Sequence, residues 1–440
     1  MFKRYFRPLH WLAASLVLML SLPVQASVEI QHWQTANGAR VYFVPAPELP
    51  MVDVRVIFDA AGARDKLPGV ALMTNGLMAE GAAGMDADEI ADAFAAVGAN
   101  FSTSSHRDMS VVNLRSLTQA DLLDPALATA AKVIQRPDFP DEALERERKR
   151  LLIALQGEKQ SPGAIASDTF FSAIYGDHPY ADDPKGNEDS VKQIQRRHLM
   201  AHHERYYVGK NAIVALVGDL KRDQAEQLAE RLVGKLPAGK AAPPIPEVEP
   251  LKQAQRIVKA FPSSQTHLLL GQPAIERGDP DFFALYVGNH VLGGSGLVSR
   301  LSEEIRDKRG LAYSSYSYFS PMRQRGPFRM GLQTRNDQAE QALDIVKQTL
   351  VTFMDKGPTA EELEAAKKNI IGGFALNLDS NSKIVENIAM IGFYGLPLDY
   401  LDTYTDKVEA VTIAQIKQAF DRHVDPETLV TVMVGDTTAE

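Results

Sequence analysis

The sequence predicts an α+β protein of two duplicated domains, each a largely antiparallel sheet with helices packed on one face. The main observation is that the triplet Val-Gly-Asp closes an apolar strand pattern twice, at 217–219 and at 434–436, which are 217 positions apart. Between the two copies, residues 236–250 contain five prolines among polar and small residues. Such a stretch is typical of a semi-rigid linker.

The domain boundaries follow from this duplication. The same offset places Arg205 onto Arg422, near the end of the helix that precedes each Val-Gly-Asp strand. Chance recurrence of a strand-turn signal is the alternative. If the repeat is real, a first domain over 27–240 and a second domain over 251–440 flank a linker at 241–250.

Local patterns predict the elements of the first half in order. Residues 85–97 are typical of an amphipathic helix, because Ile90, Phe94 and Val97 share one face behind an acidic start. Alternation of apolar and β-branched residues predicts strands at 40–44, 52–58, 100–104, 110–117 and 214–217. Helical composition predicts further helices at 69–78, 126–134 and 142–155.

Residues 1–26 are typical of a secretory signal peptide. Lys3, Arg4 and Arg7 precede an apolar run at 11–22, and Val-Gln-Ala at 24–26 forms a cleavage site. The alternative is a membrane anchor, but the run is shorter than the ~20 residues needed to cross a bilayer. We therefore expect a soluble mature protein that is exported across the inner membrane, and the compact signal favours the bacterial periplasm.

Composition excludes several functional classes. The 440 residues are 45% hydrophobic and 23% charged, which is typical of folded globular protein. The net charge is -9, and -12 without the three cations of the signal, so a nucleic-acid-binding protein is not expected. The chain has no Cys, no Gly-x-Ser-x-Gly elbow and no phosphate loop, and nothing supports an independent enzyme of another chemistry.

Several short strings, in their order and spacing, resemble the pitrilysin/insulinase family of zinc peptidases over nearly the whole mature chain. No single string is decisive. The strings are Asn37-Gly38, Gly176 to Tyr180, Tyr207, Asn211 and Val217 to Asp219 in the first half, and Leu292 to Gly296, Ser299 to Leu301 and Glu304 to Tyr313 in the second. The resemblance implies a clam-shell arrangement of the two domains.

Active members of this family carry H-x-x-E-H on the first long helix, where two His bind zinc and the Glu acts as base. No H-x-x-E-H occurs in this sequence. Aligned on Gly69, the two His positions hold Leu72 and Gly76, and the base position holds Asn75. The resemblance places the distal ligand at or beside Ala154. Leu and Gly have no ligating side chain and Asn cannot take a proton, so we expect no zinc and no cofactor in this chain.

The resemblance assigns a remaining catalytic feature to Arg306 and Tyr313. In active members, an Arg and a Tyr at this spacing reach over the zinc site, contact substrate and stabilise the tetrahedral state. A guanidinium and a phenol can both donate to a developing oxyanion. In the structural alternative, Arg306 pairs with Glu303 on its own helix and Tyr313 is half-buried on a strand.

The segment 100–104 matches the family's edge strand, to which a peptide adds as a further strand. The backbone supplies this binding, so the identities of the side chains carry little information. A plain sheet edge is the alternative. The substrate-binding residues that the resemblance implies are Asn100, Phe101, Ser102 and Thr103.

His198 and His202 have the i, i+4 spacing of metal ligands, beside His203. Because residues 191–207 have an ordinary amphipathic pattern, we expect a solvated helix face instead. His178 is expected to form a hydrogen bond in a loop, and His290 to be structural.

Two functions remain open. The leading hypothesis is a non-catalytic subunit, without peptidase activity of its own, that binds peptide and supplies Arg306 and Tyr313 to a zinc-bearing homologue in a heterodimer or larger assembly. The second is a peptide-binding or assembly scaffold with no role in proteolysis. Retention of the Arg-Tyr pair favours the first.

Overall fold

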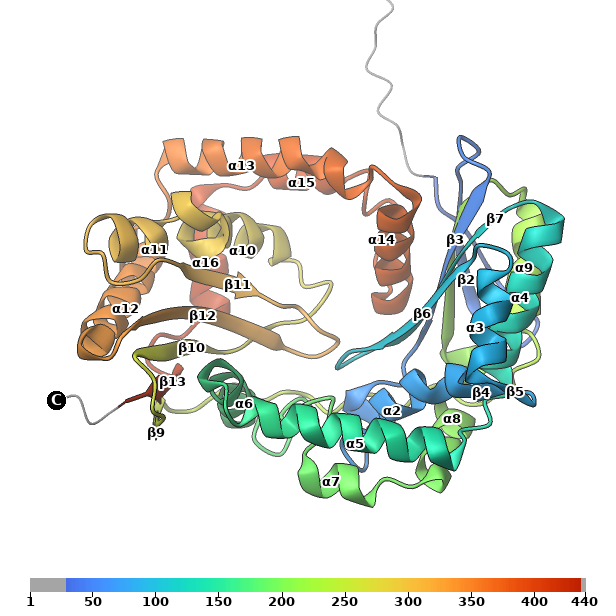
Figure 1. Ribbon diagram of the computed structural model, residues 1–440. Helices are drawn as coiled ribbons and strands as arrows, with labels where there is room; N and C mark the ends of the chain where they lie inside the picture. The colour runs from blue at the N-terminus through green and yellow to red at the C-terminus, as the bar shows by residue number, and fades with distance from the viewer. Residues whose placement is uncertain (1–28, 437–440) are drawn as a thin grey trace, which may run out of the picture.

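The computed structural model describes residues 29–436, so the expected signal peptide at 1–26 lies outside the described residues. Its first half contains a six-stranded mixed sheet, shown on the right of Figure 1. In spatial order the strands are β1 (Gln31–Gln34), β2 (Arg40–Pro45), β8 (Ala212–Gly218), β3 (Met51–Phe58), β7 (Ser110–Leu117) and β6 (Asn100–Ser105). Only the β2–β8 pair is parallel among them.

Along the chain, the described part of the first half contains eight α-helices, which lie between the strands or follow the last of them. Their bounds are α2 (Val70–Leu77), α3 (Ala87–Ala95), α4 (Ala120–Gln135), α5 (Asp141–Glu158), α6 (Pro162–Tyr175), α7 (Glu188–Gln193), α8 (Arg196–Tyr206) and α9 (Arg222–Val233). A short hairpin of β4 (Gly81–Ala82) and β5 (Met85–Asp86) precedes α3. Asp86 caps α3 through a capping box with Glu89, as the acidic start of this segment predicts.

The second half repeats this plan around a five-stranded sheet. Its order is β11 (Ser315–Phe319), β12 (Gly326–Arg335), β10 (Gln265–Ile275), β13 (Val430–Gly435) and β9 (Gln255–Ala260), with only β13–β9 parallel. Its helices are α10 (Phe282–Asn289), α11 (Arg300–Ser302), α12 (Ala339–Lys356), α13 (Ala360–Phe374), α14 (Asn381–Tyr394), α15 (Tyr404–Glu409) and α16 (Ile413–His423). π-Helical turns follow α10 (His290–Gly294) and α11 (Glu303–Asp307).

The predicted α+β class with largely antiparallel sheets is confirmed, and most predicted elements are present. Helix α4 is longer than expected, because it begins at Ala120 and includes Pro125. A proline within the first turns of a helix removes few hydrogen bonds, so it need not mark the start of the helix. Strand β8 is buried along its whole length, as a central strand covered on both faces requires.

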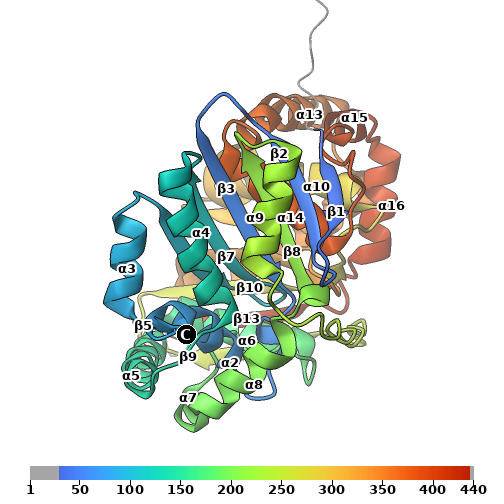
Figure 2. The ribbon, with the colours of Figure 1, turned by 90° about the vertical axis from the view of Figure 1, so that its right-hand side faces the viewer.

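Each sheet has two covered faces, and the two halves exchange a helix. One face of each sheet packs on helices of its own half. The other face of the first sheet is covered by α14, and that of the second sheet by α6 (Figures 1 and 2). The contact is close on both sides: a Cβ added to Gly392 of α14 would lie 2.4 Å from the Tyr42 ring, and one added to Gly271 of β10 would lie 2.9 Å from Phe170 of α6.

Residues 241–250 form no helix or strand, but they are attached to the first half. Ile245 and Val248 are buried in the same apolar cluster as α6. The guanidinium of Arg64 donates to the carbonyl oxygen of Pro243, and Nε2 of His178 contacts the carbonyl oxygen of Pro246. This segment therefore follows a fixed path. Within residues 29–436, no helix combines the length and apolar character needed to span a membrane.

Candidate functional site

The positions that would carry the zinc ligands have no metal-binding side chain. Leu72 on α2 is half-buried and packs against the first core, and Gly76 is exposed, with no atom within 4 Å of where its Cβ would lie. Ala154 lies exposed on α5, the helix that contacts α2. None of the three side chains has a nitrogen, oxygen or sulfur atom that could hold zinc.

Asn75, at the position of the base, has a structural role instead. Its side chain is buried, and its Nδ2 donates to the carbonyl of Ser104 on β6 at 2.7 Å and to that of Val111 on β7 at 3.2 Å. Its Oδ1 accepts from the Tyr207 hydroxyl at 3.1 Å. Asn75 therefore fastens helix α2 to the two strands at the edge of the first sheet, and its amide is fully used.

The second half contains the same fastening, which sequence reasoning missed. Asn289 ends α10, and its Nδ2 donates to the carbonyl of Ser317 on the edge strand β11 at 2.9 Å. The Ser317 hydroxyl donates back to Asn289 Oδ1 at 2.6 Å. Each half thus has an Asn near the end of this helix that is bound to its edge strand. The signal was present as an Asn near the end of each first helix, but no motif marks it.

The two edge strands differ in what lies beside them. Strand β6 forms the outer edge of the first sheet and has no strand partner beyond it. Strand β11 is the corresponding edge, but the π-helical turn after α10 covers it, since a Cβ on Gly293 would lie 2.5 Å from the Ser317 nitrogen. Of these two edge strands, β6 is the one suited to strand addition, while β1 and β9 form the opposite edges of the two sheets.

The predicted peptide-binding residues lie along β6. Asn100 and Ser102 face outward and are more exposed than their neighbours, as strand alternation requires. Phe101 stacks on Phe94 of α3, with ring centroids 4.7 Å apart, which anchors the strand from below. Thr103 pairs with Val112 of β7. The placement agrees with an edge strand held in position by its inner side chains.

Arg306 and Tyr313 lie together, as their spacing suggested. Arg306 lies on the π-helical turn after α11, and its guanidinium carbon is 5.3 Å from the centre of the Tyr313 ring. The structural alternative is wrong for both residues. Glu303 pairs with Lys308 at 3.0 Å instead, and Tyr313, which precedes β11, is 80% exposed. The pair is a cation–π contact that presents its phenol to solvent.

The histidines of α8 are buried to different degrees, so the expected solvated face is wrong for His202. Its ring is buried, its Nε2 lies 2.8 Å from the carbonyl of Ala60, and burial lowers its pKa to about 4. His203 contacts the carbonyl of Ile134 at 2.9 Å. His198 contacts the backbone nitrogen of Gln195 at the start of the helix. The three rings serve packing and capping, and they do not converge on a metal.

Asp279, Asp281 and His423 are grouped closely enough for metal binding, the single such group among residues 29–436. However, Arg422 binds both oxygens of Asp281, at 2.6 and 2.8 Å, and this hydrogen bonding lowers the pKa of Asp281. His423 Nε2 also contacts Asp281 at 3.0 Å. The group is an ion-pair network that ties the loop before α10 to the end of α16.

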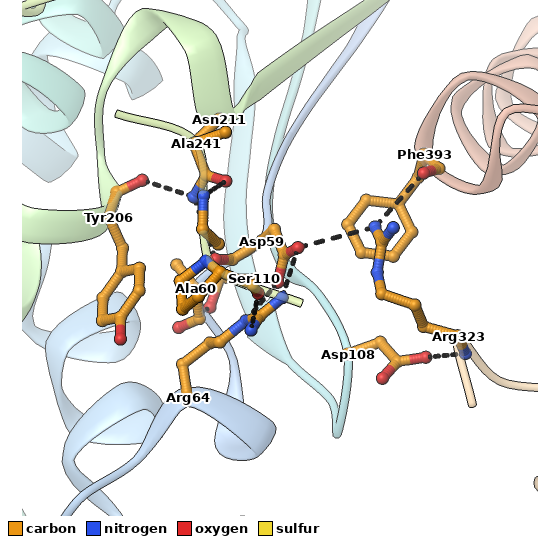
Figure 3. Close-up of polar contacts among 12 residues, drawn as sticks. Asp59, Ala60, Arg64, Asp108, Ser110, Tyr206, Asn211, Ala241, Arg323 and Phe393 are labelled. Atoms are coloured by element: carbon orange, nitrogen blue, oxygen red, sulfur yellow. Dashed lines mark hydrogen bonds and ion pairs between the residues drawn. The ribbon is translucent and has the colours of Figure 1, made fainter. Parts of the chain in front are cut away.

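A polar network connects the two halves where their hairpin turns meet (Figure 3). Asp108, in the turn between β6 and β7, accepts from the Tyr180 hydroxyl at 2.6 Å, from the Arg323 backbone nitrogen at 2.7 Å and from the Tyr394 hydroxyl at 3.1 Å. Arg323 also forms an ion pair with Asp59 at 3.6 Å. Asp59 in turn binds Arg64 at 2.7 Å. Sequence reasoning missed this network because its members are distant in the chain.

Comparison with known proteins identifies the family. Residues 47–183 match the model described as Insulinase (Peptidase family M16), and residues 193–370 match that of the Peptidase M16 inactive domain. A crystal structure of a peptidase M16 inactive domain from Pseudomonas fluorescens is 41% identical, covers 94% of this chain and 99% of that chain, and has a TM-score of 0.91.

Curated relatives agree with this assignment. A Helicobacter pylori protein named Non-peptidase homolog YmxG is 27% identical over 434 residues, covering 96% of this chain and 98% of that protein. A Bacillus subtilis protein named Uncharacterized zinc protease YmxG is 26% identical over 362 residues, covering 81% and 87%. The chain belongs to peptidase family M16, as a homologue whose sequence contains no H-x-x-E-H motif.

Proposed function

We propose that this chain is the non-catalytic subunit of an exported zinc metallopeptidase. It binds peptide along β6 and supplies Arg306 and Tyr313 to the site of a partner, a homologue with H-x-x-E-H. The observation that carries the proposal is the Arg306–Tyr313 pair: a guanidinium 5.3 Å from a ring that is 80% exposed, in a chain without zinc ligands.

The exposure of this pair supports a role outside the chain. A large aromatic side chain that is mostly exposed gains little from the core, and such residues are enriched where one protein binds another. Here the guanidinium of Arg306 contacts one face of the Tyr313 ring, and this contact orients the guanidinium and the phenol relative to each other. A partner surface or a bound peptide would complete their contacts.

The chemistry of the pair suits peptide-bond hydrolysis at a neighbouring site. The partner's zinc would polarise the carbonyl and activate water. In this chain, the guanidinium of Arg306 and the phenol of Tyr313 are both hydrogen-bond donors. Both can stabilise the negative charge that develops on the carbonyl oxygen, which is where preorganised donors contribute most to rate.

A second function is favoured by the edge of the first sheet. Asn75 fastens β6 without any metal, so the strand can receive a peptide although the catalytic groups are absent. A peptide-binding or assembly scaffold with no role in proteolysis would need this feature and not the Arg-Tyr pair. The two functions therefore differ in their dependence on Arg306 and Tyr313.

Reconstitution with the zinc-bearing homologue tests the proposal. We expect the mature chain to co-purify with an H-x-x-E-H homologue from its native host, in the periplasmic fraction and without residues 1–26. In that complex, Arg306→Ala or Tyr313→Phe should lower kcat by roughly 100- to 1,000-fold, the usual cost of losing one oxyanion donor. Arg309→Ala is the matched control, because Arg309 lies on the same segment and binds Glu304.

Folding and assembly must be unchanged for the result to count, which size-exclusion chromatography of each variant with the zinc subunit checks. A rise confined to KM would indicate uniform substrate binding. Full turnover in both variants would reject the supplied pair and leave the scaffold function. Tightly bound zinc in the isolated chain, removed by substituting His198 and His202, would contradict the proposal from the start.

A further inference from the structure

A cavity with a volume of about 580 Å³ lies where the two halves meet. The start of α6 forms one wall, and β10, β12 and the segment before β11 form the other. Tyr313 lines it, whereas none of the positions Leu72, Asn75, Gly76 and Ala154 does. The cavity thus begins at the tyrosine of the Arg-Tyr pair.

No acidic side chain lines this cavity, although the chain as a whole is acidic, with a net charge of -9. Its polar side chains come from Ser, Gln, Tyr, His and Arg. Burial lowers the pKa of His267, which favours the neutral ring. Arg329 is therefore the one fixed charge in the wall, and it is positive.

Arg329 lies on β12 without an anion near it. Its Nε is buried and has no hydrogen-bond partner, and among residues 29–436 no carboxylate lies within 4.0 Å of its guanidinium. The guanidinium carbon is 4.7 Å from the ring of Tyr318, which stacks on Tyr316. Burial lowers the pKa of this guanidinium as well, as expected for a cation that no carboxylate compensates.

Two arginines near the interface of the two halves share a carboxylate, whereas Arg107 and Arg277, like Arg329, have a buried Nε without a hydrogen-bond partner in the described part of the chain. Arg64 binds Asp59, and Arg323 reaches the same carboxylate. A half-buried cation without an anion loses hydration and gains little in return. A carboxylate entering the cavity would supply the missing partner, and a guanidinium can bind it through two parallel hydrogen bonds.

We propose that this cavity is a subsite for a peptide carboxylate, with Arg329 as its positive charge. The proposal rests on the proposed peptide-binding function, because Tyr313 links the cavity to the bound peptide. The carboxylate can be the C-terminus of the peptide or the side chain of an Asp or Glu. The site therefore selects peptides with a negative charge at a fixed distance from the segment held by Tyr313.

Equilibrium binding to the isolated mature chain tests the subsite. Fluorescence anisotropy would compare one labelled ten-residue peptide with its C-terminal amide and with versions in which each internal Glu is replaced by Gln. Loss of the carboxylate that is used should weaken binding by roughly 10- to 100-fold, the effect of one charge-assisted hydrogen bond. The amide arm and the Glu-to-Gln arms distinguish the two sources of the carboxylate.

Arg329→Gln should weaken binding of the charged peptide by a similar factor and remove its preference over the neutral version. Ser167→Asp, which places a carboxylate in the same cavity, should remove the preference by a second route. Arg335→Gln is the matched control, since Arg335 is the exposed end of β12 and binds Asp337 at 2.8 Å. The preference should also weaken with added salt.

The outcomes separate the subsite from the function on which it rests. If charged and neutral peptides bind equally well and Arg329→Gln has no effect, the subsite is rejected while peptide binding stands. If no peptide of the series binds the wild-type chain, peptide binding by this chain alone is rejected, and the subsite with it. If the Arg329→Gln variant does not fold, Ser167→Asp and the comparison with the peptide amide test the subsite instead.

Discussion

Asn75, which the family resemblance aligns with the general base of active members, has hydrogen-bond partners on both polar atoms of its side chain. Its amide donates to two strand carbonyls and its oxygen accepts from Tyr207. The equivalent fastening by Asn289 in the second half shows that this arrangement belongs to the fold itself. Asn75 in the first half and Asn289 in the second half therefore make the same kind of contact, a side-chain amide that donates to a carbonyl of the edge strand.

Restoring the base at this position should destabilise the protein. In Asn75→Glu, a carboxylate would face the carbonyl oxygens of Ser104 and Val111, and both carbonyls would lose the donor that Asn75 Nδ2 supplies. We expect the free energy of unfolding to fall by about 2–4 kcal/mol, measured by urea denaturation. Gln193→Glu, an amide-to-carboxylate change on the exposed surface, should stay within about 0.5 kcal/mol.

The same contacts bear on rebuilding the zinc site. Leu72→His, Asn75→Glu and Gly76→His together would break the fastening of β6 and still leave the metal one ligand short at Ala154. An Asn75→Glu variant as stable as wild type would show that the carboxyl finds donors here, and the fastening would then be dispensable.

At the scale of elements, α8 is held to the first half by buried histidines. His202 contacts the carbonyl of Ala60, which lies just after β3, and His203 contacts that of Ile134 at the end of α4. The i, i+4 spacing on α8 suggested a metal or a solvated face. In the structure, the histidines on the inner face of this helix form hydrogen bonds with backbone carbonyls.

Acid should weaken this attachment. Burial lowers the pKa of His202 to about 4, from an unfolded value of 6.5, so stability is lost as the pH falls from 6.5 through 4, by about 3 kcal/mol in full. Asp65, whose Oδ1 lies 3.9 Å from His202 Nδ1, acts in the opposite direction, because burial raises its pKa to about 8 and the folded state then binds the extra proton. The two effects offset each other in the wild-type curve.

A variant separates the two contributions. His202→Gln keeps a donor for the Ala60 carbonyl and does not titrate. We expect its stability relative to wild type to rise by about 3 kcal/mol between pH 7 and pH 4, in urea denaturation curves. His198→Gln, on the same helix, should change far less. A His202→Gln difference that is constant with pH would mean that the ring is already charged or accessible at pH 7.

At the scale of the whole molecule, the two halves are joined by exchanged helices and by Asp108. Helices α14 and α6 each complete the core of the other half, so neither half buries both faces of its sheet alone. The three hydrogen bonds to Asp108 bring together groups from three separate parts of the chain. This carboxylate fixes the β6–β7 turn, and with it the end of the edge strand β6, against the second half.

Asp108→Ala should loosen this junction. It leaves the hydroxyls of Tyr180 and Tyr394 and the Arg323 nitrogen without their acceptor in a buried setting, which should cost about 3 kcal/mol or more. Hydrogen exchange should become faster at residues 320–326, and thermal unfolding should show the loss of stability. Asp53→Ala is the control, because Asp53 binds Arg115 within the first half. Unchanged exchange at 320–326 would show that the helices alone hold the halves together.

The sequence by itself indicated the family, predicted the α+β class with largely antiparallel sheets, and showed that no H-x-x-E-H motif is present. These features are written in local periodicity and in short strings. The tertiary structure decided which helices cover each sheet, which groups Asn75 binds and which donors bind the carboxylate of Asp108. It also placed Arg329 in a cavity without an anion. Periodicity shows which face of a strand or helix is apolar. It does not show the partner, because partners such as Asn75 and Tyr207 or Asp108 and Tyr394 are 132 and 286 positions apart, and no local pattern encodes such contacts.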